Sequence, residues 1–412
     1  MLREQKAALS ELGAAVFTNL DLLPVVLNPK HVPIVTVARF SQTCTQVHQA
    51  TMTALLDVAL SDVQWSGYLA LPDPPDNWRI KGLSLKNTNV MDLSLLAHLA
   101  SLETLKLSGT RVVDVSPLAE LVSLKTLDLS FTEVTDLSPL AHLASLERLD
   151  LSCTRVTDVS PLAKLTPMKT LNLSFMGVVD VSSLAHLVSL ENLNLTSTRV
   201  VDVSPLAHLA SLETLDLSFT KVMNVSPLAH LASLENLDLA DTGVTNVSPL
   251  AKLTPMKTLN LSCMGVVDVS SLAHLASLET LYLVNTGVIN VSPLAKLFSL
   301  KEVNLRNTRV VDVSPLAKLV SLKTLDLRDT RVVDVSPLAH LASLERLHLA
   351  DTGVTDVSPL AKLVSLKTLN LRNTRVVDVS SLAKLVKLKE LHLNEKGRGG
   401  CVVAGPLRGL LV

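Results

Sequence analysis

Side chains that could bind charged groups recur in this chain at multiples of 22 residues. Three arginines, Arg306, Arg328 and Arg372, occupy equivalent positions toward the C-terminal end. A guanidinium group binds carboxylates and phosphates through paired hydrogen bonds, so this row could recognise an acidic partner segment. The alternative is a surface ladder of arginines and neighbouring aspartates, in which each exposed ion pair contributes little stability.

A second row of candidate binding residues is aromatic. The chain has only six phenylalanines, yet Phe131, Phe175 and Phe219 share one column at alternate repeats, with Cys153 between the first two. Strand spacing would set the rings about 10 Å apart, and aromatic rings are effective anchors for a protein partner. The rings could equally tuck between adjacent repeats and complete the edge of the core, and the sequence leaves both interpretations open.

A third row is formed by the residue between two strand leucines, which is mostly aspartate or asparagine. The row two residues further is mostly serine in the N-terminal half and carries the arginines in the C-terminal half. We therefore expect a small-residue, acidic half and an arginine-bearing half on one face. The residues predicted to bind a partner there are Phe131, Cys153, Phe175, Phe219, Tyr282, Arg306, Arg328, His348 and Arg372.

Catalytic and metal-binding patterns are not found in the sequence. Seven of the eleven histidines share one column, but lysine takes that position in other repeats and cannot replace a metal-ligating histidine. Carboxylates recur with the repeat period, which indicates stacked rows and not a tuned acid and base. No nucleophile–base pair, HExxH, Walker or dinucleotide motif occurs. We predict a protein that is not an enzyme and needs no cofactor and no metal.

These rows exist because one 22-residue unit repeats over residues 83–393 without insertion or deletion. In a representative unit, Leu215 and Leu217 alternate with polar neighbours, as in a strand with one buried face. Ser226-Pro227 then resembles a helix start, because serine can cap a helix and proline suits its first position. Only about six residues remain before the next unit, so a short 3₁₀ helix is expected.

Composition disfavours several classes of partner. A net charge of -1 over 412 residues gives nucleic-acid binding no general electrostatic support. The four cysteines are too widely spaced for a disulfide framework or a zinc site. Neither a signal sequence nor an apolar run of about 20 residues is found. We predict a monomeric, cytoplasmic or nuclear protein that neither crosses a membrane nor binds nucleic acid.

The repeat pattern Leu-x-x-Leu-x-Leu-x-x-Thr-x-Val-x-Asp-Val-Ser-Pro-Leu-x-x-Leu resembles the 22-residue leucine-rich repeat of bacterial internalins and of phosphatase-regulatory subunits. The resemblance implies an α/β solenoid, a horseshoe with a parallel concave β-sheet and short 3₁₀ turns on the convex face. It also implies a scaffold that binds a protein partner on the concave face, or alternatively a phosphatase regulatory subunit. Where the family has asparagine after the strand, this chain has threonine, or methionine at Met176 and Met264, where we expect a break in the polar ladder.

The ends of the chain depart from the repeat. Residues 1–79 are predicted to form a helical N-terminal region, residues 80–393 the solenoid, and residues 394–412 a C-terminal cap. Within the cap, residues 402–410 look like a degenerate half repeat that closes the core.

Part of the N-terminal region carries a second resemblance. Residues 32–48 resemble the second half of an F-box, a segment that docks on the Skp1-type adaptor of cullin ubiquitin ligases. The first half fits poorly, because Asn28-Pro29 interrupts its expected helix. The resemblance implies, as an alternative function, a substrate-recognition subunit of a ubiquitin ligase; otherwise the region is a helical cap. The adaptor-binding residues would be Val32, Pro33, Val37, Phe40 and Cys44.

Affinity purification separates these alternatives. If residues 32–48 bind the adaptor, the full chain should recover Skp1 and cullin, and a shortened chain that begins at Asp76 should not. Recovery of a phosphatase catalytic subunit with both chains would favour the phosphatase alternative. Absence of adaptor and cullin from both preparations, analysed by mass spectrometry, would eliminate the ligase alternative.

Overall fold

The computed structural model describes residues 81–393 and 402–404. These fall into two compact units, one up to Gly177 and one from Val178, and each unit is described by itself. The F-box-like residues and the helical region predicted over residues 1–79 lie outside the described residues.

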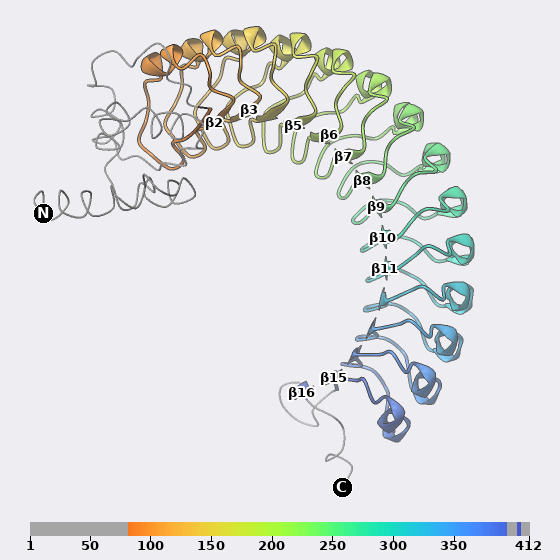
Figure 1. Cartoon of the computed structure of the whole chain (residues 1–412). Helices are drawn as coiled ribbons and strands as arrows, with labels where there is room; N and C mark the ends of the chain where they lie inside the picture. The colour runs from red at the N-terminus through yellow and green to blue at the C-terminus, as the bar shows by residue number, and fades with distance from the viewer. Residues whose placement is uncertain (1–80, 394–401, 405–412) are drawn as a thin grey trace, which may run out of the picture. The chain divides into compact units, whose positions relative to one another are not determined.

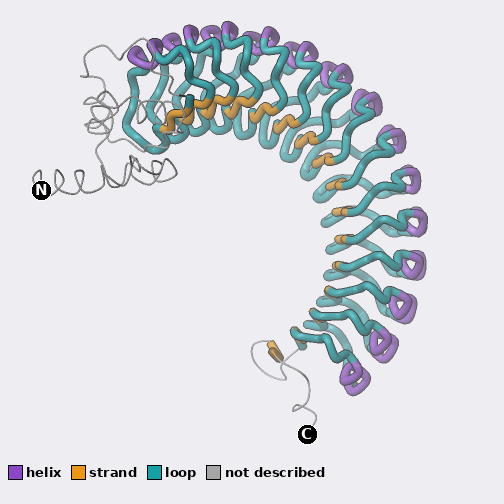
Figure 2. The backbone as a smooth tube through the Cα atoms, in the orientation of Figure 1, coloured by secondary structure: helices purple, strands orange, loops and turns teal. Residues whose placement is uncertain are grey.

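Each repeat contributes a three-residue strand and a five-residue 3₁₀ helix (Figure 2). The first unit contains β1 (Gly82–Ser84), η2 (Ser94–His98), β2 (Thr104–Lys106), η3 (Ser116–Glu120), β3 (Thr126–Asp128), η4 (Ser138–His142), β4 (Arg148–Asp150), η5 (Ser160–Lys164) and β5 (Thr170–Asn172). The short 3₁₀ helices predicted from the repeat length are therefore confirmed.

The second unit continues the same alternation and ends with an additional strand. It contains η6 (Ser182–His186), β6 (Asn192–Asn194), η7 (Ser204–His208), β7 (Thr214–Asp216), η8 (Ser226–His230), β8 (Asn236–Asp238), η9 (Ser248–Lys252), β9 (Thr258–Asn260), η10 (Ser270–His274), β10 (Thr280–Tyr282), η11 (Ser292–Lys296), β11 (Glu302–Asn304), η12 (Ser314–Lys318), β12 (Thr324–Asp326), η13 (Ser336–His340), β13 (Arg346–His348), η14 (Ser358–Lys362), β14 (Thr368–Asn370), η15 (Ser380–Lys384), β15 (Glu390–His392) and β16 (Val402–Ala404).

Within each unit, sequential strands up to β15 pair in parallel and in register. Leu215 of β7 lies opposite Leu237 of β8, which in turn lies opposite Leu259 of β9, so every step is one 22-residue repeat. In the second unit the strands line the inner edge of the curve and the 3₁₀ helices the outer edge (Figure 1). The predicted solenoid with a parallel sheet is confirmed.

The C-terminal end differs from the sequence prediction. Residues 402–404 form β16, which pairs with β15 in the antiparallel direction, with Val403 opposite Leu391. A half repeat would have added a parallel strand, so that interpretation is wrong. A strand that returns antiparallel instead covers the backbone edge of β15, which would otherwise offer unpaired hydrogen-bonding groups.

The core is a continuous stack of aliphatic side chains from equivalent positions. In one repeat the buried members are Leu212, Leu215, Leu217, Val222, Val225, Leu228 and Leu231. None of them is more than 1% exposed, because the repeats on either side cover them. A single repeat has no interior of its own, so burial of these side chains requires neighbours in register.

The 3₁₀ helices are capped by aspartate or asparagine and not by the serine that the sequence suggested. Ser336 is the first residue of η13, and its backbone N–H donates to Oδ1 of Asp334 at 2.8 Å. Asn224 does the same for Ser226 at 2.9 Å. The serine is thus the residue that is capped. Its backbone N–H has no partner inside the helix, and the side chain of the aspartate or asparagine accepts it.

A ladder of buried threonines supports the turn that follows each strand. Thr308 and Thr330 each donate their hydroxyl to the carbonyl oxygen three residues earlier, at 2.7 and 2.6 Å. Met176 and Met264 occupy the same position with 4% and 5% exposure, and their side chains have no hydroxyl to donate. The expected interruption of the ladder therefore occurs, and apolar packing replaces the hydrogen bond.

Acidification should weaken this capping. The backbone N–H and hydroxyl of Ser336 hold the pKa of Asp334 below its usual value of 3.8, and Ser380 acts likewise on Asp378. A carboxyl group whose pKa is lowered on folding stabilises the folded state above its unfolded pKa and loses that contribution as the pH falls. We expect the free energy of unfolding, measured by chemical denaturation, to decline below about pH 4.

The matched variants are Asp334→Asn and Asp378→Asn, which copy the natural caps Asn224, Asn246 and Asn290. An asparagine cap accepts the same N–H bond but does not titrate, so these variants should lose less stability between neutral and acidic pH than the parent chain. An unchanged acid-induced loss in the double variant would show that Asp334 and Asp378 do not contribute to it.

Candidate functional site

The surface that could bind a partner is the strand face. We define it as the outward residues of the strands and the turn residues that follow them. Outward side chains are two residues apart, because side chains alternate between the two sides of a strand. In the second unit these are the rows through His348, Asn370 and His392, and through Arg328 and Arg372.

One turn residue in each repeat has a left-handed backbone. The φ angles lie between 52° and 59° for every non-glycine member of this column. Most members are asparagine, aspartate or serine, the types that tolerate this conformation. The bulky members are Phe131, Phe175 and Phe219, with φ of 56°, 58° and 57°. A large side chain in this region is a genuine outlier, and it costs roughly 1–2 kcal/mol relative to ordinary backbone conformations.

The phenylalanine rings are exposed. Phe131 and Phe175 of the first unit are 65% and 61% exposed, and Phe219 of the second unit is 58% exposed. The sequence left open whether these rings complete the core, and the structure shows that they do not. The three rings therefore combine an unfavourable backbone with the solvent exposure of an apolar side chain.

The serine and aspartate rows of the strand face are mainly structural. Ser130, Ser152 and Ser218 are only 5–7% exposed, and each donates its hydroxyl to the aspartate two residues earlier at 2.6 Å. The same aspartates accept the serine backbone N–H. The small, acidic residues of this half are therefore bound to one another and to the backbone of their own turns.

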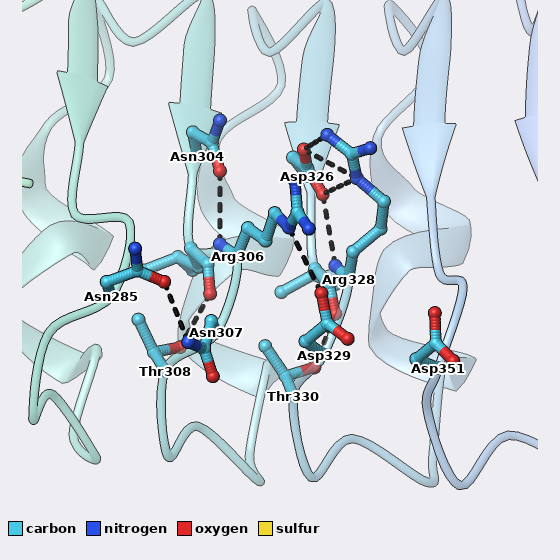
Figure 3. Close-up of polar contacts among 12 residues, drawn as sticks. Asn285, Asn304, Arg306, Asn307, Thr308, Asp326, Arg328, Asp329, Thr330 and Asp351 are labelled. Carbon is cyan, nitrogen blue, oxygen red and sulfur yellow. Dashed lines mark hydrogen bonds and ion pairs between the residues drawn. The ribbon is translucent and has the colours of Figure 1, made fainter.

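Two of the three arginines form ion pairs on this face (Figure 3). Nε of Arg306 donates to Oδ2 of Asp329, one repeat further on, at 3.0 Å. Arg328 bends back onto its own strand, where Nη2 lies 2.6 Å from Oδ2 of Asp326. Asp326 is 5% exposed, and its hydrogen bond with Arg328 raises the pKa of that guanidinium. The charge-ladder interpretation holds for these two arginines.

Arg372 differs from both. No ion pair of Arg372 is found within the described residues, and its Nε is buried without a hydrogen-bond partner. The Nδ1 atoms of His348 and His392 are also buried without partners. Asn370 precedes Arg372 by two residues. In the sheet, His348 lies on one side of Asn370 and His392 on the other. Burial holds the pKa of His348 below its usual value.

Of the two remaining predicted residues, Tyr282 has a local side-chain partner and Cys153 is a free thiol. The hydroxyl of Tyr282 donates to Oε1 of Glu302 at 3.1 Å, and burial raises the pKa of that tyrosine. Cys153 is a half-buried free thiol whose pKa is raised by burial, so it is a poor nucleophile. The structure thus separates the predicted set into exposed rings, paired arginines and one cluster around Arg372.

Sequence reasoning missed an exposed aliphatic column four residues after the left-handed position. In the second unit its members, each more than half exposed, include Val201, Met223, Val267, Ile289 and Val311. Beside its central part, three successive glycines replace the arginine or lysine found in neighbouring repeats: Gly243, Gly265 and Gly287. Tabulating departures from the repeat at every position, and not only along the strand, would have found this column.

Among the described residues, neither a metal-binding cluster nor a membrane-spanning helix is found. Within residues 81–393 and 402–404, histidine, cysteine, aspartate and glutamate form no group of three that could hold a metal ion. In the same part of the chain no helix is long and apolar enough to cross a bilayer.

The fold and this face define a class: solenoids whose stacked parallel strands present a surface of repeat positions. A model of leucine-rich repeats (2 copies) matches residues 100–142, 122–164, 298–340, 320–362 and 342–383. The chain belongs to the leucine-rich repeat family, and its repeats resemble those of internalins. Leucine-rich repeat domains are typically protein-binding scaffolds and generally non-catalytic.

Solved structures share the fold. An internalin, inlF of Listeria monocytogenes, is 31% identical with a TM-score of 0.68, and the match covers 70% of this chain and 85% of the internalin. A leucine-rich repeat protein of Leptospira interrogans is 20% identical with a TM-score of 0.73, covering 79% and 86%. The plant peptide hormone receptor RGFR1, solved in complex with RGF2, is 15% identical with a TM-score of 0.58, covering 76% and 62%. No curated protein sequence matches the chain.

The buried Asp326–Arg328 pair can be tested by its effect on stability. Asp326→Ala should lower the free energy of unfolding by about 3 kcal/mol, because the charged guanidinium and the backbone N–H of Arg328 both lose their acceptor. Asp326→Asn should cost only about 1 kcal/mol, since an amide oxygen can still accept that N–H. Asn304 already does so for Arg306. Equal losses in the two variants, measured by urea unfolding, would show that the ion pair contributes nothing.

Proposed function

We propose that the chain is a non-enzymatic scaffold that binds a protein partner on its strand face, with the exposed phenylalanines as anchors. The observation that carries the proposal is the placement of Phe131, Phe175 and Phe219 at left-handed backbone positions while their rings stay in solvent. Exposed aromatic side chains of this kind are typical of the energetically dominant residues of protein interfaces.

Stability alone does not account for these rings. Asparagine fits the same backbone, as Asn285, Asn307 and Asn373 do at equivalent positions. The rings gain little from burial, because most of their surface stays in water. A residue that strains the backbone and leaves apolar surface exposed is instead favoured by a contact outside the chain. A protein partner supplies that contact, since it removes the rings from water.

The finer alternatives remain separate proposals. The ubiquitin-ligase alternative rests on residues 32–48 and the phosphatase alternative on the repeat type, and no contact of the described residues favours either. Both are compatible with a scaffold whose strand face selects the partner. Family membership supports the protein-binding role in general and leaves the partner unnamed.

Replacing the rings by asparagine should separate stability from binding. Phe131→Asn, Phe175→Asn and Phe219→Asn should each raise the free energy of unfolding by about 0.5–1 kcal/mol, because asparagine tolerates the left-handed conformation better. The triple variant should lose proteins that the parent chain captures in quantitative affinity purification. Loss of stability in the single variants, measured by urea unfolding, would show instead that the rings are part of the packing.

Phe298 provides the matched control. It is 60% exposed, follows η11 on the opposite side of the repeat, and has no left-handed backbone. Phe298→Asn removes an exposed ring without relieving strain, so it should not raise the stability. It should also leave capture of the strand-face partner unchanged. Equal effects of Phe298→Asn and Phe219→Asn on capture would contradict a specific role for the strand face.

A further inference from the structure

We propose that Arg372, with His348 and His392 beside it, is a binding site for a carboxylate of an acidic segment of the partner protein. The proposal rests on the scaffold function and adds to it the chemistry of one contact. The site lies on a different part of the strand face from the phenylalanines. The carboxylate site can therefore be wrong while the phenylalanine anchors are right, and the reverse.

The first observation is a comparison of arginines that share one repeat position. Arg328 is neutralised by Asp326 two residues earlier, and Arg306 by Asp329 in the next repeat. The residue two positions before Arg372 is Asn370, which carries no charge. Its Oδ1 accepts the backbone N–H of Arg372 at 3.1 Å, so it performs the structural role of Asp326 without the charge. The guanidinium of Arg372 is left without an internal counter-charge among the described residues.

The second observation is the group of buried polar atoms around it. Nε of Arg372 and Nδ1 of both histidines have no hydrogen-bond partner. His348, Asn370 and His392 lie opposite one another in β13, β14 and β15. Neighbouring strands are about 4.8 Å apart, so the two imidazoles flank the outward side of β14 at about 10 Å from each other. A buried polar atom without a partner costs about 1–3 kcal/mol, which a hydrogen bond with a bound group would recover.

The charged groups around the site favour an anion. Arg328 and Arg346 lie on the β12 and β13 side of His348, and Asp326 opposes them there. On the β15 side, Oε2 of Glu390 lies 4.0 Å from Nε2 of His392. Asp326 is already bound to Arg328, so Arg372 is the arginine of its row that has no ion pair among the described residues. A carboxylate fits the planar guanidinium through two parallel hydrogen bonds.

A partner segment also suits the location of the site. It lies on the strand face of the same unit as Phe219, where a protein that runs along the repeats would contact it. An acidic side chain that enters the site would offer its two oxygens to Arg372 and to an imidazole proton. Binding therefore favours the protonated form of His348, which burial otherwise disfavours.

The test uses the full chain and a fluorescent hexaglutamate peptide, with hexaglutamine as the neutral probe. Fluorescence anisotropy at low salt should show binding of the glutamate peptide only. Arg372→Gln should weaken that binding by at least about tenfold, the loss of one charge-assisted contact of about 1.4 kcal/mol or more. Arg306→Gln is the matched control at the same repeat position, and it should change the affinity less than twofold, since Arg306 is already paired.

Two further readouts keep the outcome decisive. The His348 imidazole, followed by NMR, should titrate at higher pH with the peptide bound and should not move in Arg372→Gln. Inorganic phosphate, added at the same total negative charge as the hexaglutamate peptide, tests the preference of the site. A general anion site would bind both, and a carboxylate site would bind the peptide more tightly. Tighter binding of phosphate than of the peptide would overturn the carboxylate assignment. Equal losses in Arg306→Gln and Arg372→Gln would overturn the site itself.

Failure of this site and failure of the scaffold proposal can be told apart. The variant that combines Phe131→Asn, Phe175→Asn and Phe219→Asn should bind the hexaglutamate peptide as the parent chain does. Loss of partner capture in that variant with retained peptide binding supports both proposals. Retained partner capture there with a tenfold loss in Arg372→Gln supports the anion site and rejects the phenylalanine anchors.

Discussion

The structure depends on each repeat lying in register with its neighbours. The aliphatic side chains of a repeat are buried by the repeats before and after it, and the backbone N–H groups of a strand and its turn bond to the next repeat. Leu217 N–H donates to the carbonyl oxygen of Asp238, and Phe219 N–H to that of Ala240. An insertion of one residue would break both sets at once, which explains why the 22-residue period has no exception over residues 83–393.

Register has a consequence for the surface, because every outward position is repeated side by side. Many of these rows serve the turn itself: aspartates accept backbone N–H groups, threonines donate to carbonyls, and small serines fit beneath them. Such rows look functional in the sequence because they are polar and regular. They are regular because every turn has the same unsatisfied backbone groups. The informative residues are those that a turn does not need, such as Phe131 and Phe175.

The fold could be predicted from the sequence because it follows from local rules that every repeat obeys. Alternating leucines such as Leu215 and Leu217 predict a strand, and the short distance to the next unit predicts a 3₁₀ helix. The direction of β16 could not be predicted, since residues 402–404 no longer follow the period. The exposure of Phe219 could not be predicted either, because the same spacing fits a ring in the core edge and a ring in solvent, and only the structure distinguishes the two.

Arg328 and Arg372 show why position in a repeat does not determine function. Both follow a strand by two residues, and both have their backbone N–H bound by the side chain two residues earlier. For Arg328 that side chain is Asp326, which accepts the backbone N–H and also forms the ion pair with the guanidinium. For Arg372 it is an asparagine, which accepts the same backbone N–H but carries no charge, and the guanidinium has no ion pair among the described residues. Arg306 also follows an asparagine, Asn304, and its guanidinium pairs instead with Asp329 of the next repeat. In a repeat protein, the residues that support an arginine decide whether it can bind a partner.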